Sequence, residues 1–521
     1  MKLLGTSLIG GRRGQAGART FHASNRATGS PLEPAYSVAT GAEVDAAVSL
    51  AAAAAPIYGA LSGGERAAFL RCMADKIEAA ADDLATRAPL ETGLAEGRIR
   101  QETGRTVGQL RMFADLIAEG SWVDARIDHA DPQRKPLPKP DVRSMLRPLG
   151  PIVTFAVSNF PIAFSAAGGD AAAALAAGNP VVVKAHPAHP GTAEIVAGAV
   201  REAVVECGLP EGTFSLLYDD GIEVGRSLVT HPWIKGVAFT GSRVAGRALM
   251  DLAAARAEPI PVFAEMSSVN PVFILPGAMT QRGTEIARGL QTSVTLGVGQ
   301  FCTCPGLVFI PDSAASAAFL TELSRAMEQA PAAAMLSDAI SESYTRGVDK
   351  LTAEAGVEVL CRVQSSGGPA VLVTDIRTFL ANKELSGEVF GPCTLIVRGI
   401  DHATALEAAE LLEGQLTATI HGTDDELPSW RDLVQRLAEK AGRVLYNGFP
   451  TGVEVCHAMV HGGPYPATSD GRYTSVGSAA IFRFTRRVSF QNFPDTALPA
   501  ELQEANPCRI RRLVDGTCRD I

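Results

Sequence analysis

The stretch Gly150-Pro151-Ile152-Val153-Thr154-Phe155-Ala156-Val157 is the clearest indication of how this chain folds, because it reads as a buried β-strand. Short apolar runs that are rich in β-branched residues and bounded by glycine or proline are typical of strands in parallel sheets. Small, helix-forming residues follow at 161–177, and Pro180-Val181-Val182-Val183-Lys184 is a second buried strand. The same alternation continues to Thr240. It predicts an α/β fold with a doubly wound parallel sheet, in which ligands bind at the carboxyl ends of the strands.

Composition and charge narrow the possible functions. The chain has 521 residues, of which 46% are hydrophobic and 20% charged, and its formal net charge is −9. This is a globular composition, long enough for two or three domains. The acidic balance argues against a nucleic-acid partner, and no apolar run approaches the roughly 20 residues of a membrane-spanning helix. Nine scattered cysteines predict neither a disulfide framework nor a metal site, which favours a reducing, cytoplasmic location.

A cysteine near the middle of the chain is placed as a nucleophile would be. The sequence reads Gly297-Val298-Gly299-Gln300-Phe301-Cys302-Thr303-Cys304-Pro305-Gly306, after a helix-like run and before the strand-like run 307–310. A nucleophilic thiolate needs an exposed sulfur, and glycines let backbone N–H groups approach a reacting oxygen. Most cysteines are small buried hydrophobic residues, so this segment alone leaves both interpretations open.

Residues at the ends of two predicted strands suit a phosphate or a ribose. Thr240-Gly241-Ser242 ends a strand and opens a helix that contains Gly246, and a helix N-terminus attracts phosphate. The spacing departs from Gly-x-Gly-x-x-Gly, and a serine that only caps the helix is an equal alternative. Lys184 closes an apolar strand, where it either binds a ligand or extends to solvent.

Two carboxylates and one amide occupy similar positions. Glu265 follows an apolar strand, where partial burial would raise its pKa toward that of a general base, although a surface or capping glutamate is an equal alternative. Asn159 lies just after the strand at 150–157, where its amide either donates to an oxyanion or forms a turn. Glu388, followed by Val389-Phe390-Gly391-Pro392, is equally ambiguous.

The order of these motifs resembles that of the NAD(P)-dependent aldehyde dehydrogenase superfamily, over roughly residues 31–494. The motifs that carry the resemblance are Asn159-Phe160-Pro161, Lys184, Phe239-Thr240-Gly241-Ser242 with Gly246, Glu265, Gly299-Gln300-x-Cys302 and Glu388-x-Phe390-Gly391-Pro392. The resemblance implies a doubly wound cofactor-binding domain, a second α/β catalytic domain and a β oligomerisation flap.

The resemblance also implies a role for each matching residue. Cys302 would attack the aldehyde to form a thiohemiacetal, and Asn159 with the Cys302 backbone N–H would hold the oxyanion. Glu265 would activate the water that hydrolyses the thioester. Lys184 and Glu388 would hold ribose hydroxyls, and Ser242 would contact the pyrophosphate. The implied cofactor site consists of Lys184, Thr240, Gly241, Ser242, Gly246, Glu388 and Phe390.

Four further segments resemble one subgroup, the α-ketoglutarate semialdehyde (2,5-dioxovalerate) dehydrogenases. They are residues 264–271, 446–455, 461–468 and 488–494. This subgroup oxidises 2,5-dioxopentanoate to 2-oxoglutarate. A related branch oxidises long-chain fatty aldehydes, so that substrate remains an alternative. A catalytically silent relative and a cysteine hydrolase are less favoured, because the catalytic and cofactor motifs are intact.

Departures from the family pattern bear on the cofactor and on one neighbouring thiol. After Lys184 the chain reads Ala185-His186-Pro187-Ala188-His189, without the carboxylate that many NAD-preferring members carry three residues on. Such a carboxylate repels a 2′-phosphate, so its absence favours NADP, with NAD as an alternative. Cys304 stands where the subgroup has asparagine, and a thiol there could form an adduct with Cys302 under oxidation.

The aldehyde substrate is expected to contact a predicted helix and the Asn159 motif. Arg105 and Gln109 lie one turn apart on that helix, and the resemblance implies that it lines the substrate tunnel. An arginine fork suits a distal carboxylate, although a solvated arginine is an equal alternative. Phe160 completes the predicted substrate site.

The chain is expected to divide into segments of different function. Residues 1–30, which carry three arginines and no acidic residue before Thr20, are expected to be a disordered lead-in or, less favoured, a weak targeting segment. The other expected segments are a cofactor-binding domain at 31–265 with an oligomerisation arm at 128–142, a catalytic domain at 266–445, a return to the first domain at 446–495 with a long strand at 476–490, and a tail at 496–521. The family suggests a homodimer or homotetramer.

Overall fold

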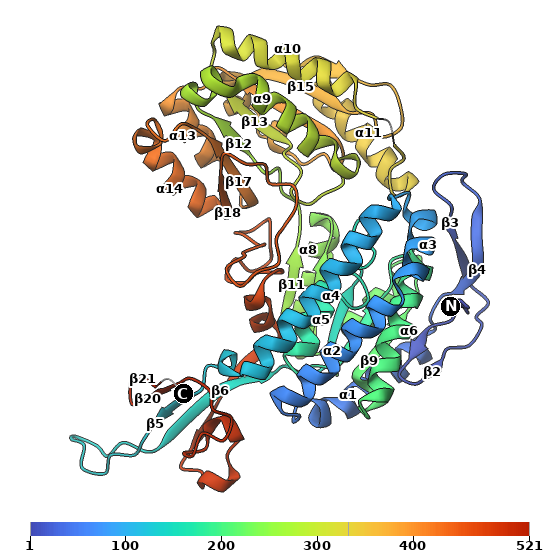
Figure 1. Cartoon of the computed structure of the whole chain (residues 1–521), viewed down its shortest axis with the longest axis vertical. Helices are drawn as coiled ribbons and strands as arrows, with labels where there is room; N and C mark the ends of the chain where they lie inside the picture. Colours follow the sequence, from blue (N-terminus) through green and yellow to red (C-terminus); the bar gives the residue numbers. More distant parts are fainter. Residues whose placement is uncertain (1, 332, 520–521) are drawn as a thin grey trace.

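The computed structural model describes residues 2–331 and 333–519 and contains two large lobes and a smaller sheet (Figure 1). The first sheet has the order β11 (Val262–Glu265), β10 (Gly236–Thr240), β7 (Ile152–Phe155), β8 (Val181–Lys184), β9 (Phe214–Leu217), β1 (Leu8–Ile9) and β2 (Arg12–Arg13). Strands β11 to β9 are parallel, and β1 joins β9 in the antiparallel direction. The predicted doubly wound parallel sheet is therefore confirmed.

Helices cover both faces of this sheet, which is why its strands are apolar on both sides. They are α1 (Gly41–Tyr58), α2 (Gly63–Ala79), α3 (Ala81–Thr92), α4 (Glu96–Glu119), α5 (Gly169–Ala176), α6 (Pro190–Glu206), α7 (Glu223–Thr230) and α8 (Arg243–Ala254). The helix predicted over 161–177 is confirmed only for its second half. The preceding residues form turns, because Glu102 accepts the backbone N–H groups of Ile162 and Ala163.

The second lobe is built on another sheet, of order β14 (Glu358–Arg362), β15 (Ala370–Asp375), β16 (Cys393–Arg398), β13 (Leu307–Ile310), β12 (Val272–Ile274), β17 (Gln415–His421) and β18 (Ala441–Tyr446). The edge strand β14 is antiparallel and the other strands are parallel. Its helices are α9 (Pro276–Thr295), α10 (Ala314–Glu328), α11 (Asp338–Ala353), α12 (Ile376–Ala381), α13 (His402–Leu411) and α14 (Arg431–Lys440).

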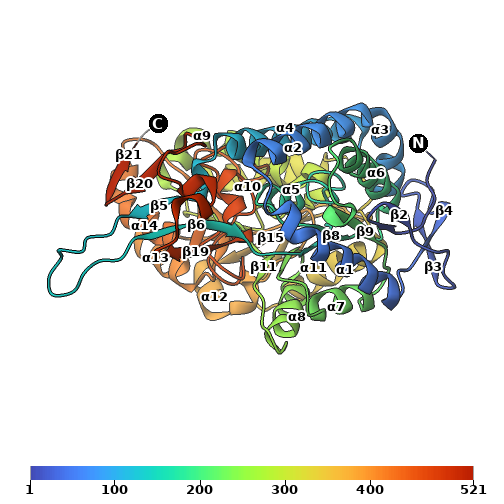
Figure 2. The same ribbon diagram turned by 90° about the horizontal axis from the view of Figure 1, so that it is seen from below.

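The smaller sheet joins the arm, the late strand and the tail. Its order is β19 (Thr485–Gln491), β6 (Val142–Pro148), β5 (Arg126–Asp128), β20 (Arg512–Val514) and β21 (Thr517–Arg519), and the loop between β5 and β6 projects from the molecule (Figure 2). The strand predicted over 476–490 was too long. Residues 478–484 form the 3-10 helix η6 (Ser478–Phe484), which buries Ile481 and Phe484 in the first lobe.

The expectation of a disordered lead-in was wrong for residues 2–30. Leu8 and Ile9 are buried, and β1 pairs with β9 at the end of the first sheet. One arginine of this basic segment also anchors it, because Arg13 pairs with the buried Glu194 at 2.8 Å. A short hairpin of β3 (Thr20–Ser24) and β4 (Pro31–Ser37) follows. Among the described residues, the structure has no helix with the length and apolar character needed to cross a membrane.

Candidate active site

Cys302 lies on the loop between the 3-10 helix η3 (Leu296–Gly299) and strand β13. Gly299 has a left-handed backbone (φ 63°), and a Cβ there would lie 2.3 Å from the backbone of Gly391. This position therefore requires glycine. Asn270 holds the other side of the loop, since its Nδ2 donates to the carbonyl oxygens of Cys302 at 2.9 Å and Cys304 at 3.0 Å. These contacts fix the backbone that carries the nucleophilic sulfur.

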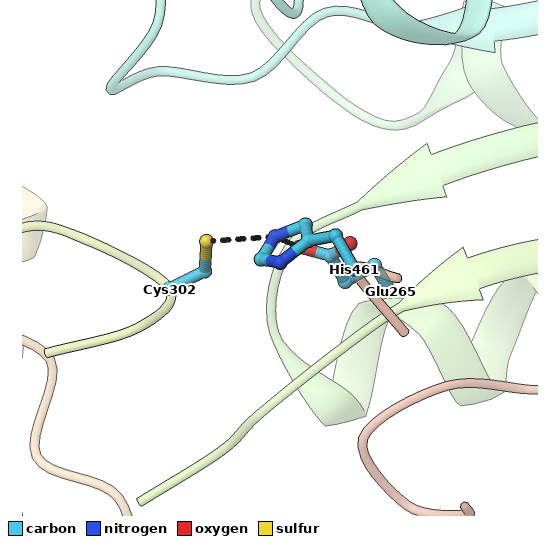
Figure 3. A group of neighbouring side chains, drawn as sticks. All are labelled: Glu265, Cys302 and His461. Atoms are coloured by element: carbon cyan, nitrogen blue, oxygen red, sulfur yellow. Dashed lines mark hydrogen bonds and ion pairs between the residues drawn. The ribbon is translucent and has the colours of Figure 1, made fainter. Parts of the chain in front are cut away.

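The Cys302 side chain faces His461, which in turn contacts Glu265 (Figure 3). Cys302 Sγ lies 3.3 Å from His461 Nε2, and the same nitrogen lies 3.0 Å from Glu265 Oε1. Glu265 ends β11 as predicted, whereas His461 comes from the long loop after β18. In the sequence, this histidine is recognisable only as part of a subgroup motif. No local pattern connects it with a cysteine 159 residues away.

Cys302, His461 and Glu265 form a trio in the candidate active site, and surrounding hydrogen bonds hold His461 and Glu265 in place. Ser475 Oγ donates to Glu265 Oε2 at 2.6 Å, and the Ser475 backbone N–H donates to His461 O at 2.7 Å. The His461 backbone N–H donates to Thr474 Oγ1 at 2.8 Å. A β-bridge between Glu265 and Thr468 joins the same loop to the end of β11. The loop at 461–475 is thus part of the site.

The electrostatics of the trio correct the expectation that Glu265 has a raised pKa. Burial would raise the pKa of Glu265, but the ion pair with His461 and the Ser475 hydroxyl outweigh it, and the pKa is lowered. Burial would lower the pKa of His461, yet Glu265 and Cys302 raise it to about 10. The pKa of Cys302 is raised, because burial outweighs the attraction to His461. His461 therefore lies between a thiol and a carboxylate that both favour its protonated form.

Asn159 reaches the cysteine loop from the first lobe. Its Nδ2 donates to Gln300 O at 2.8 Å, two residues before Cys302. An amide nitrogen carries two N–H groups, so this contact leaves one of them for a ligand. The turn after Asn159 is anchored by the buried Glu102, whose Oε1 accepts the Ile162 and Ala163 N–H groups, both at 2.9 Å.

The predicted cofactor residues lie at the carboxyl edge of the first sheet and opposite it. Lys184 ends β8, its Nζ lies 3.4 Å from Asp219 O, and burial lowers its pKa. Thr240 ends β10 and pairs in register with Glu265. Glu388 comes from the second lobe. Its side chain is exposed at the surface, yet nearby protein atoms partly desolvate the carboxylate. This desolvation raises the pKa of Glu388 to about 7, although hydrogen bonds from the Ser267 hydroxyl and the Ser268 N–H act to lower it.

The start of α8 fits both interpretations of its sequence. Ser242 is the N-cap, and its Oγ accepts from Ala245 N at 3.3 Å, which leaves the first backbone N–H groups of the helix directed outward. Gly241 N donates to Glu265 O at 3.0 Å. Gly246 has a packing role, because a Cβ there would lie 2.6 Å from Met266 Sδ. A lysine and a helix N-terminus at the edge of the first sheet, together with a carboxylate from the second lobe, fit a dinucleotide cofactor. Phe390 lines a cavity with Glu388.

The predicted substrate residues differ in what they offer a ligand. Arg105 on α4 is largely buried, its guanidinium carbon lies 5.1 Å from the Phe164 ring centroid, and Nη2 lies 3.5 Å from Val453 O. Its Nη1 is buried without a hydrogen-bond partner in the described residues. Phe160 stacks edge-on with Phe301, the neighbour of Cys302. Gln109 has no exposed surface and accepts from Gly169 N at 3.2 Å, which joins α4 to α5, and its Nε2 is also buried without a hydrogen-bond partner in the described residues.

Cys304 is separated from the chemistry by its surroundings. Its Sγ lies 3.8 Å from the carbonyl oxygens of Val294 and Gly391, and burial raises its pKa far above the ordinary range. A protonated thiol is a poor nucleophile. The structure therefore gives no support to an adduct between Cys304 and Cys302.

Two curated proteins are similar to nearly the whole length of this chain. Among curated proteins, the chain is similar to alpha-ketoglutaric semialdehyde dehydrogenase 2 of Azospirillum brasilense, with 49% identity and 99% of each chain covered. It is 46% identical to an alpha-ketoglutaric semialdehyde dehydrogenase of Acinetobacter baylyi, with 98% of each chain covered.

Solved structures of similar fold include two that contain NAD+. One is betaine aldehyde dehydrogenase from Staphylococcus aureus, with a TM-score of 0.79, 20% identity, and coverage of 94% of this chain and 95% of that one. The other is an aldehyde dehydrogenase from Bacillus cereus, with a TM-score of 0.79, 23% identity, and coverage of 93% and 96%. The model of the aldehyde dehydrogenase family matches residues 13–485. The chain therefore belongs to the aldehyde dehydrogenase family and is an NAD(P)-dependent enzyme that oxidises an aldehyde to a carboxylic acid.

Proposed function

We propose that the enzyme oxidises 2,5-dioxopentanoate to 2-oxoglutarate, with NADP+ as its preferred cofactor. Two relatives that align with nearly the whole chain, at 49% and 46% identity, carry the name of this activity. The structural observation that carries the substrate class is the guanidinium of Arg105, which is largely buried and keeps a partnerless Nη1. A carboxylate at the far end of the substrate would satisfy it.

The reaction begins at Cys302 Sγ. The Cys302 thiol releases its proton to solvent, and the thiolate attacks the aldehyde carbon and forms a C–S bond. Before the attack His461 Nε2, 3.3 Å away, stabilises the negative charge on sulfur. The aldehyde oxygen becomes an oxyanion, which accepts hydrogen bonds from the second N–H of Asn159 and from the backbone N–H of Cys302. The resulting adduct is a thiohemiacetal.

The cofactor site is proposed from residues of both lobes. Nicotinamide, when bound, supplies the hydride acceptor. Lys184 and Glu388 would bind ribose hydroxyls, and the N-terminus of α8 at Ser242 would bind the pyrophosphate. The position three residues after Lys184 is Pro187, so no carboxylate repels a 2′-phosphate there. This absence supports NADP+ over NAD+.

Glu265 completes the reaction by taking a proton from the water that hydrolyses the thioester. In the resting site both of its oxygens are occupied, by His461 and Ser475. Once sulfur is part of a thioester it carries no negative charge, so it no longer helps to hold a proton on His461. We expect His461 to release that proton to solvent at this stage, which ends the ion pair and frees Oε1 of Glu265 to accept the proton of water.

The test is steady-state kinetics with several aldehydes and both cofactors. The panel contains 2,5-dioxopentanoate, succinic and glutaric semialdehydes and a long aliphatic aldehyde. Under the proposal, kcat/KM is highest for 2,5-dioxopentanoate with NADP+. A higher value for the long aldehyde would favour the fatty aldehyde alternative, and a large preference for NAD+ would contradict the cofactor assignment.

A variant of Arg105 tests the substrate contact directly. Arg105→Ala should raise KM for 2,5-dioxopentanoate by about 100-fold, because a buried charge pair is lost. KM for an uncharged aldehyde should change little. Arg100→Ala is the matched control, since Arg100 lies on the same helix but is 47% exposed. Equal effects on the charged and uncharged substrates would refute the contact.

Assembly and location are part of the same proposal. Strand β19 lies at one edge of the smaller sheet, which supports pairing with a second copy in a homodimer or homotetramer. All nine cysteines are free, which supports a reducing, cytoplasmic setting.

A further inference from the structure

The trio at the centre of the site also has the composition of a metal site. One ligand atom from each of Cys302, His461 and Glu265 lies within 4.8 Å of the other two. Thiolate, imidazole and carboxylate are the donors that Zn²⁺ prefers, and three protein ligands leave its fourth position open. In residues 2–331 and 333–519 no other group of three such side chains comes this close together.

Two of the three donors are already held in the positions that a metal would require. Ser475 Oγ binds Glu265 Oε2 at 2.6 Å, which leaves Oε1 directed at His461. The main chain of His461 is fixed by Ser475 N and by Thr474 Oγ1. Because such outer contacts orient metal ligands, the site needs little rearrangement to accept a cation. A cation bound between Cys302 Sγ, His461 Nε2 and Glu265 Oε1 would replace the proton that His461 Nε2 directs at the other two atoms.

The surroundings of His461 Nδ1 indicate that such a metal would not be permanently bound. His461 Nδ1 is buried and has no hydrogen-bond partner in the described part of the chain. A metal-binding histidine usually donates its other N–H to a carboxylate, a carbonyl or water, which strengthens the metal bond. A site without that partner should bind and release its metal reversibly.

We propose that Cys302, His461 and Glu265 form a reversible inhibitory site for Zn²⁺. Binding would displace the thiol proton and the Nε2 proton into solvent and form Zn–S, Zn–N and Zn–O bonds. No redox change is involved. The bound metal would occupy the nucleophile, its charge partner and the base together, so it would block both attack on the aldehyde and hydrolysis of the thioester. An aldehyde would compete with the metal for the sulfur.

The experiment measures metal binding separately from activity. Enzyme treated with EDTA and freed of chelator is titrated with Co²⁺, and a thiolate-to-cobalt charge-transfer band in the near ultraviolet reports coordination by cysteine. Zn²⁺ affinity is then measured by competition with a chromophoric chelator, and inhibition by Zn²⁺ is measured against increasing aldehyde. EDTA should restore full activity.

Variants of the three donors decide the assignment. Cys302→Ser should abolish the cobalt band. His461→Phe and Glu265→Gln should each weaken Zn²⁺ binding by more than the roughly 10-fold expected for loss of an outer contact in Ser475→Ala. Cys304→Ser is the matched control, since it removes the neighbouring thiol and should leave both the band and the Zn²⁺ affinity unchanged.

Two results would overturn the proposal. One is Zn²⁺ binding of equal affinity in His461→Phe and in the unaltered enzyme, which would mean that the thiol binds the metal alone. The other is a cobalt band that survives in Cys302→Ser. Because these readouts do not depend on which aldehyde is oxidised, failure here is distinguishable from failure of the proposed substrate.

Discussion

At the scale of single residues, His461 changes how the catalytic cysteine is understood. Its Nε2 faces both Cys302 Sγ and Glu265 Oε1. Under the proposed mechanism this one nitrogen would stabilise the nucleophile before attack and restrain the base until the sulfur is acylated. This arrangement explains why Glu265 has a lowered pKa despite its burial. The proposed mechanism would thus follow an order of events that neither the carboxylate nor the thiol would impose alone.

Replacing this histidine should slow the reaction before hydrolysis. In His461→Phe the thiolate loses its charge partner, and we expect kcat/KM to fall by about 100-fold, a common size for the loss of one group that stabilises charge at the reacting centre. Stopped-flow measurement of NADPH formation in the first turnover locates the loss in the attack step. Cys304→Ser should behave like the unaltered enzyme. A His461→Phe enzyme with an unchanged first turnover would contradict this role.

Glu388 predicts how cofactor binding depends on pH. Its pKa is raised to about 7, so it is ionised above that pH and protonated below it. A neutral carboxyl accepts a ribose hydroxyl more weakly, because charge-assisted hydrogen bonds are the stronger ones. KM for NADP+ should therefore rise as the pH falls from 8 to 6.

The matched variants isolate this group. Glu388→Gln should have a high KM for NADP+ at every pH and lose the rise. Glu384→Gln alters an exposed neighbour that pairs with Lys350, and it should keep the normal profile. The assignment fails if Glu388→Gln retains the same dependence on pH.

At the scale of elements, short sequence patterns predicted the strands, because strand formation here depends on local sequence. The buried strands that end at Lys184, Thr240 and Glu265 could be read from short apolar runs, and their parallel pairing placed these residues at one edge. The turn after Asn159 could not, because residues 161–168 have helical composition and are held out of a helix by Glu102 from another element. Long-range hydrogen bonds leave no local signal.

This turn gives a prediction about stability. Glu102 is 2% exposed, and Glu102→Ala would leave two buried backbone N–H groups without an acceptor. The free energy of unfolding should fall by about 2 kcal/mol or more, measured by urea denaturation. Glu96→Ala, an exposed glutamate in the first turn of the same helix, should cost less than about 1 kcal/mol. A loss of similar size in both variants would mean that Glu102 stabilises α4 and not the turn.

At the scale of the whole molecule, the site is assembled from parts that are far apart in the chain. Cys302 precedes β13 in the second lobe, Asn159 follows β7 and Glu265 ends β11 in the first lobe, and His461 lies in the loop after β18. Figure 1 shows the two lobes that carry these strands. The N-terminal residues were predicted to be disordered, but they extend the first sheet. The sequence did not reveal this because a two-residue strand is too short to show a pattern. The sequence motifs therefore predicted the catalytic residues, whereas only the fold showed which of them touch.

The smaller sheet yields the last prediction, which concerns assembly. Strand β19 is hydrogen-bonded to β6 on one side and lies at the edge of the sheet, and an unpaired edge of this length invites a second chain. If two copies pair along β19, Val488→Glu places like charges close together and should convert the oligomer to smaller species, seen by light scattering at micromolar protein. Val488→Thr keeps the β-branched shape without the charge and should leave the mass unchanged. Because all the residues of the catalytic trio come from one chain, the smaller species should retain the cobalt band even if activity falls. An unchanged mass in Val488→Glu would exclude β19 from the interface.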